Sequence, residues 1–409
     1  MSPAPLLPVD DAIARIGSAI TPLATEEAAV SDAGGRILAE PLTARRTHPP
    51  FDGSAMDGYA VRLADTSTVP ARLSVVGESA AGGSYDQQLG DSEAVRIFTG
   101  APLPTGADTI VIQENTERDG DTVSINEAPK PDQHIRRAGI DFTEGDNFFA
   151  AGRVLSASDV ALAAAMNIPD LSVFKKPRVA FFATGDELVL PGETPGPNQI
   201  VSSNSAGLSA LITELGGVPL DLGIARDNEA SIRECAERAK EADVLVTVGG
   251  ASVGDHDLVQ PVLTTMGLSV DFWRIAMRPG KPLMFGDFNG TPFLGLPGNP
   301  VSALVCGHLF LRAAIAARQG ARAAHPALVP VTLGADLREN DKRQDYLRAT
   351  IQIVDGAWIA SPLNRQDSSM LSALSRSHCL LVRPPHALAA QTGDICPAVL
   401  LRAPDLSTV

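Results

Sequence analysis

The sequence predicts a multidomain α/β protein, in which a doubly wound α/β domain is joined to β-rich domains and to an elongated domain of mixed helix and strand. A chain of 409 residues is too long for one compact core and divides into several domains. Strand-like and helix-like segments alternate between residues 178 and 318, which is typical of a mostly parallel sheet covered on both faces. Short strand-like runs separated by Gly, Pro and Asp fill residues 51–137 and the chain after residue 326, which indicates β-rich domains.

The first part of the chain predicts a helix on either side of a β-rich region. Residues 9–20 place their isoleucines on one helical face, so this segment forms an amphipathic helix. An alternating run at 109–113 indicates one of the strands of the β-rich region. Residues 153–168 return to a helical pattern, with Ser156 or Ser158 as the N-cap.

The α/β domain is predicted to follow a linker at residues 175–177. Its expected strands lie at 178–188, 218–228, 243–250, 282–288 and 291–300, and its expected helices at 203–217, 229–242 and 301–318. Alternation at 347–355 and an apolar run at 379–384 predict a small barrel or sandwich near the C-terminus. The predicted domains are an elongated N-terminal domain (1–50 with 138–175), an inserted β-rich domain (51–137), the α/β domain (176–324) and a C-terminal β-barrel (325–409).

Composition and charge exclude several classes of function. The chain has 33 basic and 48 acidic residues and a net charge of -15, a field that repels nucleic acid and anionic membranes. Apolar stretches are interrupted before they reach bilayer-spanning length, and Asp10 and Asp11 stand where a signal peptide would need an apolar run. The four cysteines are widely spaced, which argues against a zinc site or a disulfide framework. We expect a cytoplasmic protein that captures any anionic substrate through a local basic cluster.

The segment 242–257, ADVLVTVGGASVGDHD, is the most informative part of the chain. A β-branched run at 244–248 predicts a buried strand, which ends in a glycine loop before a helix that begins near Asp257. Glycines let the backbone approach a ligand, so that N–H groups and the helix N-terminus can hold a phosphate. Carboxylates beside a phosphate site suit Mg²⁺. The loop glycines are Gly249, Gly250 and Gly254, and the carboxylates are Asp255 and Asp257.

Three predicted strand ends carry unusual loops, at residues 184–188 (TGDEL), 249–257 and 297–300 (PGNP). In an open α/β sheet the ligand binds beyond the carboxyl ends of the strands, where the strand order reverses. If the three loops face one cleft, a single metal ion could be bound by Glu187, Asp227 and Asp257. The alternative is that each acid only caps the helix that follows it.

The segment 274–281, RIAMRPGK, supplies a local basic cluster. Its cations are Arg274, Arg278 and Lys281, and the Pro-Gly pair predicts a turn directly before the lysine. Arg forms bidentate contacts with an oxyanion, whereas Lys acts as a compact point charge. As the alternative, these side chains are ordinary surface cations. The segment is not a Walker A motif, because no GxxxxGK[ST] is present.

Residues 250–254, GASVG, also match the GxSxG pattern of a serine hydrolase. A hydrolase with Ser252 as nucleophile would need an acid and a histidine later in the chain, and no histidine there follows a predicted strand in a suitable setting. The carboxylates Asp255 and Asp257 would also disfavour an alkoxide beside them. We therefore prefer a phosphate loop to a nucleophile elbow.

Taken together, the motifs FDGSAMDGYAVR, RIFTGAPLPTGAD, IRRAGID, TGDEL, GGASVGDHD, AMRPGKP and GLPGNPVSAL stand in a specific order and spacing. In this respect the chain resembles the molybdopterin molybdenumtransferase family of the MoeA type, whose relatives include the E domain of gephyrin. The resemblance extends from about residue 10 to the C-terminus. It implies an enzyme that takes adenylylated molybdopterin and molybdate, releases AMP with Mg²⁺ present, and forms the molybdenum cofactor. It also implies an elongated homodimer with the active cleft at the subunit interface.

The resemblance assigns site residues motif by motif. One wall of the cleft, facing the α/β domain of the other subunit, would be formed by Asp57, Thr99 and Asp141. The working residues of the α/β domain would be Glu187, Asp227, Asp257, Arg278 and Lys281, with the first three as metal ligands. Further substrate contacts would come from Gly249, Gly250, Ser252, Gly254, Arg274, Pro297, Gly298, Asn299 and Pro300, and from Arg348 and Ser368 of the last domain.

The chain departs from the family pattern at two places. Ser202 stands where the helix after TGDEL usually begins with an acid, which removes one metal ligand or cap, and the arginines at 274 and 278 stand where lysines are also common. A second hypothesis is a non-catalytic molybdopterin-binding scaffold, since gephyrin-type relatives also cluster receptors. The resemblance further suggests transient contacts with the molybdopterin adenylyltransferase and with molybdoenzyme chaperones.

Overall fold

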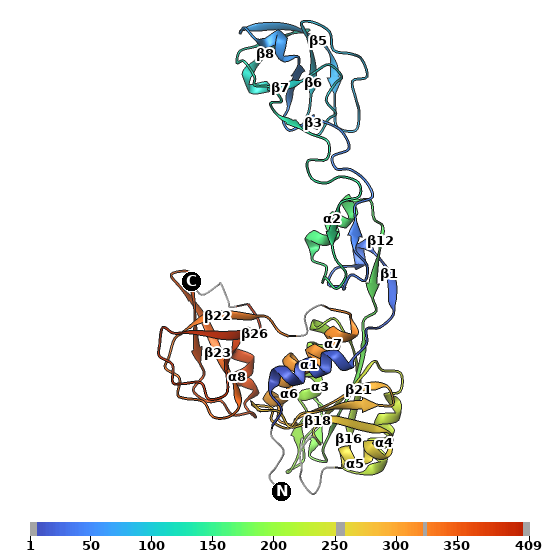
Figure 1. Ribbon diagram of the computed structural model, residues 1–409, viewed down its shortest axis with the longest axis vertical. Helices are drawn as coiled ribbons and strands as arrows, with labels where there is room; N and C mark the ends of the chain where they lie inside the picture. Colours follow the sequence, from blue (N-terminus) through green and yellow to red (C-terminus); the bar gives the residue numbers. More distant parts are fainter. Residues whose placement is uncertain (1–5, 251–257, 322–324, 404–409) are drawn as a thin grey trace.

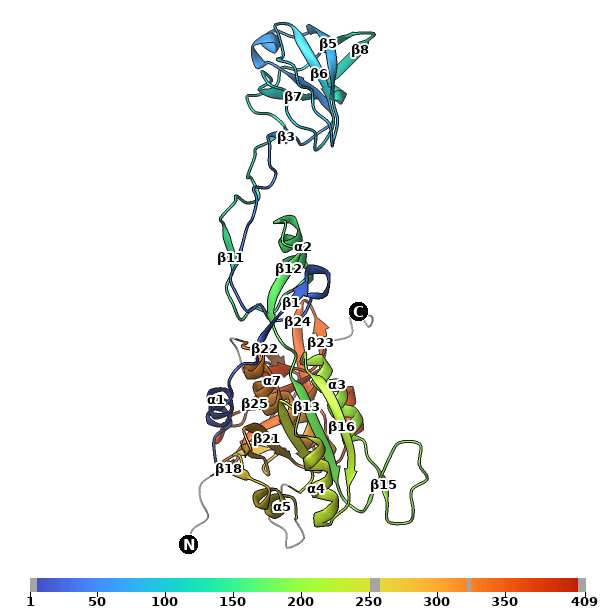
Figure 2. The same ribbon diagram turned by 90° about the vertical axis from the view of Figure 1, so that its right-hand side faces the viewer.

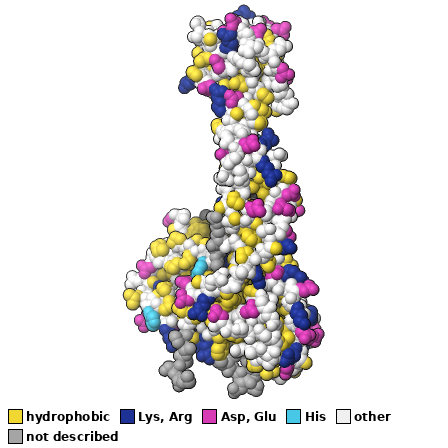
Figure 3. Space-filling model, turned by 45° about the vertical axis from the view of Figure 1, so that its right-hand side comes forward, with side chains coloured by type: hydrophobic (Ala, Val, Ile, Leu, Met, Phe, Trp, Pro, Cys, Tyr) yellow, Lys and Arg dark blue, Asp and Glu magenta, His cyan; other side chains and the backbone are white. Residues whose placement is uncertain are grey.

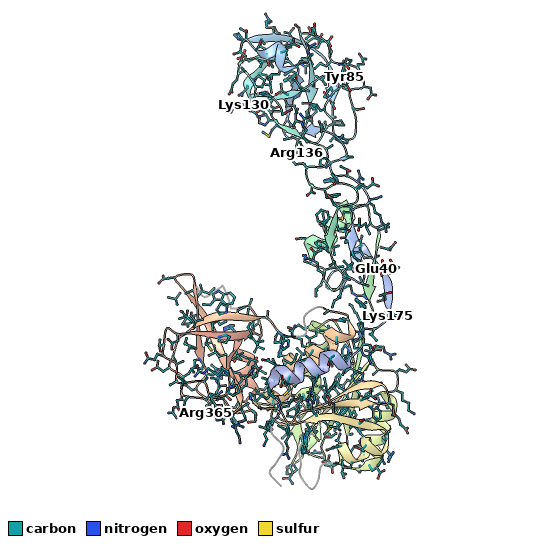
Figure 4. The ribbon with its side chains drawn as sticks, in the orientation of Figure 1. Glu40, Tyr85, Lys130, Arg136, Lys175 and Arg365 are labelled. Atoms are coloured by element: carbon teal, nitrogen blue, oxygen red, sulfur yellow. The ribbon has the colours of Figure 1, made fainter. Side chains whose placement is uncertain are left out.

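The computed structural model describes residues 6–250, 258–321 and 325–403. These residues form an elongated molecule, with a β-rich domain at one end of the long axis and an α/β domain beside a barrel at the other (Figure 1). A narrow stalk connects the two ends (Figure 3). The chain runs along the stalk, through the β-rich domain and back again (Figure 2). The stalk is therefore built from two segments that are far apart in the sequence, and Lys175 marks where the second of them meets the α/β domain (Figure 4).

The α/β domain consists of a mostly parallel sheet covered by helices. Its strands are β13 (Arg178–Thr184), β16 (Val218–Ala225), β17 (Val244–Val248), β18 (Leu268–Trp273), β20 (Met284–Phe288) and β21 (Thr291–Leu296), with the small pair β14 (Leu188–Val189) and β15 (Ile200–Val201). Its helices are α1 (Val9–Ala19), α3 (Asn204–Glu214), α4 (Glu229–Arg238), α5 (Val259–Thr265), α6 (Pro300–Cys306), η4 (Gly307–Leu311) and α7 (Arg312–Arg318). All of the strands and helices predicted between residues 178 and 318 are therefore present.

The order of the strands in this sheet is β16-β13-β17-β21-β20-β18. The first four run parallel, β20 pairs antiparallel with β21, and the edge strand β18 pairs antiparallel with β20. One apolar core joins the sheet to α3 and α6–α7, and a second core joins its other face to α4 and α5. Both faces are covered, which confirms the doubly wound prediction. Because β13 is the first strand along the chain and lies between β16 and β17, the strand order reverses between β13 and β17.

The amphipathic helix predicted at 9–20 is present as α1, and it packs in the core of the α/β domain. Ile13 and Ile16 are 1% and 0% exposed, and both belong to the apolar cluster that contains α6 and α7. The sequence prediction grouped residues 1–50 with the elongated domain. In the structure the apolar face of α1 is buried against α7, so the stalk begins only after this helix.

The helix predicted at 301–318 is divided into α6, a π-helical turn η4, and α7. A Cβ atom added at Gly307 in this turn would lie 2.6 Å from Leu211 Cδ2 of α3, so the glycine permits the two helices to approach closely. The expectation that no apolar stretch reaches bilayer-spanning length was wrong for residues 300–318, which are long and apolar enough to cross a membrane by length and composition. In the structure, 67% of the apolar window in this stretch is buried in the protein. The apolar composition of this helix therefore reflects its place in the core.

The C-terminal domain is a barrel. Its elements are β22 (Leu328–Leu333), β23 (Gln344–Val354), β24 (Ala357–Pro362), α8 (Leu371–Arg376), β25 (Cys379–Arg383) and β26 (Ile395–Leu400), and it is joined by β19 (Met277–Arg278) from the α/β domain. The strands follow the order β23-β24-β22-β26-β25, and β25 pairs again with β23, which closes the barrel. Parallel pairing of β19 with β23 attaches the barrel to the α/β domain.

The remaining elements form the β-rich domain and the stalk. The β-rich domain contains β3 (Gly53–Ser54), β4 (Gly58–Val61), η2 (Leu63–Thr66), β5 (Ala71–Ser79), β6 (Glu93–Ile97), β7 (Thr109–Ile112), η3 (Gln113–Asn115), β8 (Thr116–Asp119), β9 (Thr122–Ile125) and β10 (Ile135–Arg136). The stalk contains β1 (Thr25–Ala29), η1 (Val30–Asp32), β2 (Leu42–Thr43), β11 (Asn147–Phe149), α2 (Ala157–Ala165) and β12 (Asp170–Phe174). Of the two predicted N-caps for α2, Ser156 is the one used, in a capping box with Asp159.

We predict that Gly58→Ala destabilises the β-rich domain. A Cβ atom at this position would lie 2.0 Å from the carbonyl oxygen of Val111 on the neighbouring strand β7, and a backbone atom in a sheet cannot move aside without loss of pairing. We expect a loss of about 2 kcal/mol or more in the free energy of unfolding, measured by urea denaturation. Gly34→Ala is the matched control, because nothing lies within 4 Å of its added Cβ. Equal stability of the two variants would contradict the pairing of β4 with β7.

Candidate active site

The principal cavity near the predicted loops lies at the carboxyl ends of β13 and β17, where the strand order reverses. Its volume is about 830 Å³, and Thr184 and Val248, the last residues of these two strands, lie in its wall. Gly249 and Gly250 follow with positive φ angles of 92° and 66°. Gly249 lies beside Gly298 of the PGNP loop, since a Cβ on Gly298 would be 3.6 Å from the Gly249 Cα. The predicted meeting of strand-end loops is therefore confirmed for the described residues.

The predicted cation Lys281 lies in the wall of this cavity. Its side chain is exposed, and none of the described acids forms an ion pair with it. The turn before it packs tightly on α6, because a Cβ on Gly280 would lie only 2.5 Å from the sulfur of the buried Cys306. Burial raises the pKa of the Cys306 thiol. The thiol also donates a hydrogen bond to Gly280 O at 3.7 Å. Cys306 therefore supports the backbone of the turn that carries Lys281.

Arg278 also borders the cavity, but its guanidinium is engaged with the barrel. Nε donates to Oδ1 of Asp345 at 2.9 Å, and a second contact joins Nη2 to the other oxygen of the same carboxylate. Asp345 is 5% exposed, and Asp341 lies 3.6 Å from Nη1. Arg278 therefore holds the barrel against the α/β domain, which the sequence did not predict, while its remaining exposed surface faces the cavity.

The barrel contributes one side of the cavity through the loop after β24, which Arg365 marks in Figure 4. Ser368 accepts a hydrogen bond from Asn299 Nδ2 at 2.8 Å, and its carbonyl oxygen accepts one from Val301 N–H at 3.1 Å. The loop thus closes over the start of α6, and the predicted residues Pro297 and Pro300 lie in the same wall.

Arg348 was predicted as an outer substrate contact, but in this structure it lies beneath that loop. Its side chain is 0% exposed, and Nη2 donates to the carbonyl oxygen of Asp367 at 3.3 Å. Burial lowers the pKa of the guanidinium, which Asp367 partly offsets. Arg348 therefore supports the loop from inside the barrel and does not line the cavity.

The two predicted metal ligands that the structure describes, Glu187 and Asp227, do not lie in one site. Glu187 lies in the cavity wall, with its carboxylate folded back over Gly185. Asp227 lies outside that wall, where it and Asp186 accept hydrogen bonds from each other's backbone N–H groups at 3.3 and 3.2 Å. Asp257 lies outside the described residues, as do Ser252 and Gly254. The described His, Cys, Asp and Glu residues form no cluster of three or more.

Arg274 is also placed away from the cavity. Its guanidinium lies 4.2 Å from the centre of the Trp273 ring, and its φ of 74° is a conformation that turns the chain at the end of β18. The backbone carbonyl of Arg274 accepts a hydrogen bond from Leu7 N–H at 3.2 Å. Arg274 therefore makes a cation–π contact with Trp273 and a backbone hydrogen bond with Leu7, and it does not make the predicted substrate contact in this cavity.

The remaining predicted catalytic residues lie at the other end of the molecule. Asp57 directly precedes β4 of the β-rich domain, and its Oδ1 accepts hydrogen bonds from both the N–H and the hydroxyl of Thr99, each at 2.8 Å. These bonds lower the pKa of Asp57, with a smaller contribution from Arg96. Asp141 is exposed at the top of the stalk, where its N–H donates to His48 O. Within one chain, this group and the cavity are separated by the length of the stalk (Figure 1).

Sequence reasoning missed several residues of the cavity wall. Arg343 holds Asp341 and lowers the pKa of that carboxyl to about 2, and Asp367 adds a second carboxylate to the wall of the cavity that contains Glu187. The serines and Asn204 at the start of α3 also line the cavity. The only sequence signal for them is the polar run SSN directly after a short strand.

Comparison with known proteins identifies this architecture. Three family descriptions match successive parts of the chain: the MoeA N-terminal region (domain I and II) at residues 7–167, a probable molybdopterin binding domain at 180–317, and the MoeA C-terminal region (domain IV) at 330–401. A molybdopterin molybdenumtransferase of Nostoc sp. is 38% identical over 86% of this chain and 83% of its own length. The chain belongs to the MoeA family.

Other MoeA relatives agree over most of their length. The molybdopterin molybdenumtransferase of Haemophilus influenzae is 37% identical over 88% of this chain and 90% of the relative. A solved molybdopterin biosynthesis MoeA protein from Pyrococcus horikoshii superposes with a TM-score of 0.83 at 28% identity, and covers 97% of this chain and 100% of that one. The expected MoeA fold, with its α/β, barrel and β-rich parts, is therefore confirmed.

We predict that Thr99→Val raises the pKa of Asp57 towards its ordinary value, because the hydroxyl donor to the carboxylate is lost while the backbone donor remains. Since the pKa of the folded state is lowered, the two hydrogen bonds contribute stability above the pKa of the unfolded state, and this contribution is lost as the pH falls through the folded-state pKa. Carbon-13 NMR titration of the Asp57 carboxyl measures the change. Thr105→Val, an exposed threonine of the same domain, is the control, and an unchanged pKa in Thr99→Val would show that the hydroxyl bond is absent in solution.

Proposed function

We propose that this chain is a molybdopterin molybdenumtransferase that uses adenylylated molybdopterin and molybdate, and that it releases AMP as the molybdenum cofactor forms. The observation that carries the proposal is the cavity at the reversal of strand order, with Lys281 and Arg343 in its wall. The chain has a net charge of -15, so anionic substrates are attracted only where cations gather. Membership of the MoeA family supports the same reaction.

The groups of this cavity suit a reaction that neutralises charge. Molybdate and the phosphate linkage of the substrate are both anionic, and departure of AMP places further negative charge on its phosphate. A preorganised cation beside that phosphate stabilises the transition state more than the ground state. The tight packing of Gly280 on Cys306 restricts the backbone of the turn from which Lys281 extends. Arg278 ties the α/β domain to the barrel through Asp345, and its exposed surface borders the same cavity.

Mg²⁺ forms part of this proposal. Glu187 and Asp367 are carboxylates in the described cavity wall, and Mg²⁺ in phosphate sites is usually held by one or two carboxylates together with phosphate oxygens. The donor set therefore fits Mg²⁺ carried by the substrate. Bound there, the ion would neutralise phosphate charge. Asp227 is not part of this set, because its carboxylate is directed to Asp186.

The proposal includes a homodimer in which two subunits complete one active site. Asp57 and Thr99 lie at the far end of the molecule from the cavity of their own chain (Figure 1). The carboxylate of Asp57, whose pKa is lowered by the Thr99 hydrogen bonds, lines none of the three described pockets of its own chain. A second copy placed antiparallel would bring this pair to the cavity of its partner.

Release of AMP tests the function directly. Purified protein is mixed with adenylylated molybdopterin, with and without molybdate and Mg²⁺, and AMP is measured by chromatography. The proposal expects AMP release that requires both additions. Binding of the pterin without release of AMP under any of these conditions would favour the scaffold hypothesis.

We predict that Lys281→Ala lowers kcat by about 100- to 1,000-fold, the effect of losing one preorganised donor to a developing anion. Lys281→Arg should recover only part of the loss, because a planar fork does not replace a point charge. AMP release is the measurement, and Lys176→Ala at the exposed linker is the control. If the Lys281 and Lys176 variants had equal kcat, Lys281 would have no role in the reaction.

We predict that two inactive variants complement each other in hybrid dimers. Asp57→Asn removes the charge from one wall and Lys281→Ala removes it from the other, so a hybrid dimer retains one site with both groups intact. Mixing the two under conditions of subunit exchange should restore part of the AMP release. No restoration in dimers shown by mass spectrometry to be hybrids would mean that each site is built from one chain.

A further inference from the structure

The N-terminus of α3 opens on the cavity. Ser202, Ser203 and Asn204 all lie in the cavity wall, and α3 has 11 residues. Its N-cap residue, Ser203, makes no side-chain capping hydrogen bond, and the first turn contains no acidic residue. The free N–H groups and the positive end of the helix dipole are therefore not neutralised by the helix itself.

Buried polar atoms without partners lie at the same place. Ser202 and Ser205 are 3% and 6% exposed, and neither hydroxyl has a hydrogen-bond partner. Asn204 donates from Nδ2 to Gly298 O at 2.8 Å, whereas its buried Oδ1 is unpaired. Each buried polar group left unpaired costs about 1–3 kcal/mol, and native proteins contain few of them. A ligand that bonds to this cluster would recover that energy.

The start of α6, on another side of the cavity, differs because its polar groups already have hydrogen-bond partners. Its N–H at Val301 already donates to Ser368 O of the barrel loop, and Asn299 is bonded to the Ser368 hydroxyl. The barrel thus occupies the N-terminus of α6, whereas that of α3 keeps its donors for a ligand. Lys281, with which no described acid forms an ion pair, supplies positive charge to the same cavity, and Arg343, paired with Asp341, also borders it.

We propose that Ser202 and the N-terminus of α3 form a subsite for a tetrahedral oxyanion, either the phosphate of the adenylylated substrate or molybdate. This inference rests on the proposed function, because it names where that reaction holds one of its anions. The serine is essential to it. An acid at position 202 would cap α3 and repel the anion, whereas the serine hydroxyl can donate to an oxyanion together with the helix N–H groups.

Isothermal titration calorimetry of the full-length protein tests the subsite, with AMP and molybdate titrated separately. We expect Ser202→Ala to weaken one of the two by about fivefold through loss of one hydrogen bond. We expect Ser202→Asp to weaken the same anion by about tenfold or more through repulsion. Loss of AMP binding would assign the subsite to the phosphate, and loss of molybdate binding would assign it to the metal oxyanion.

Ser269→Asp provides the matched control, because it adds the same charge at an exposed position of the edge strand β18. Binding of both anions by Ser202→Asp with wild-type affinity would overturn the subsite, and so would an equal loss in Ser269→Asp. Thermal unfolding checks that Ser202→Asp is folded. If that variant is unfolded, the test of the subsite rests on Ser202→Ala. Unchanged affinity of Ser202→Ala for both anions overturns the proposal. AMP release by the wild-type protein tests the proposed reaction independently of the subsite at α3. Failure of the subsite and failure of the proposed reaction can therefore be distinguished.

Discussion

The contact between β19 and β23 is the interaction on which the active cavity depends. Parallel pairing of Met277 and Arg278 with Gln344 and Asp345 joins the α/β domain to the barrel, and the buried carboxylate of Asp345 holds Arg278 in place. This junction acts together with the shared apolar core and with the direct contact of Ser368 with Asn299 to hold the barrel loop over the start of α6. Without it the carboxyl ends of β13 and β17 would face solvent on the barrel side, and the cations of the RPGK turn would form an open surface.

The elongated shape of the chain constrains which residues can belong to one active site. The stalk consists of two chain segments held by short pairings, β1 with β12 and β2 with β11, and it places the Asp57–Thr99 pair far from the cavity of the same chain (Figure 1). The pair and the cavity can belong to one site only if a second subunit brings the pair of one chain to the cavity of the other. A two-subunit site would also allow entry and release of a large pterin substrate without unfolding of the barrel junction.

Local sequence patterns predicted the elements well, because periodicity and capping are local properties. The faces of residues 9–20, the Ser156 cap and the strands that end in glycine loops are all present in the structure. Contacts between distant residues were not predictable in this way. Arg278 finds Asp345 67 residues further along the chain, Arg348 is buried by the closure of the barrel, and Asp227 turns to Asp186. The partner of each of these side chains depends on which distant residue the fold brings next to it. The spacing of residues along the chain does not give that information.

The central claim is that the pair Asp57–Thr99 of one subunit faces the cavity of the other. Its most direct test is cross-linking between subunits with a short thiol-reactive reagent, since the native cysteines at 235, 306, 379 and 396 are all buried. Thr99→Cys and Ser369→Cys are prepared as separate chains, one of them carrying a mass tag, and then mixed. The account predicts cross-linked species that contain one chain of each kind. Cross-links absent from verified mixed dimers, or found instead within a single chain that carries both substitutions, would contradict it.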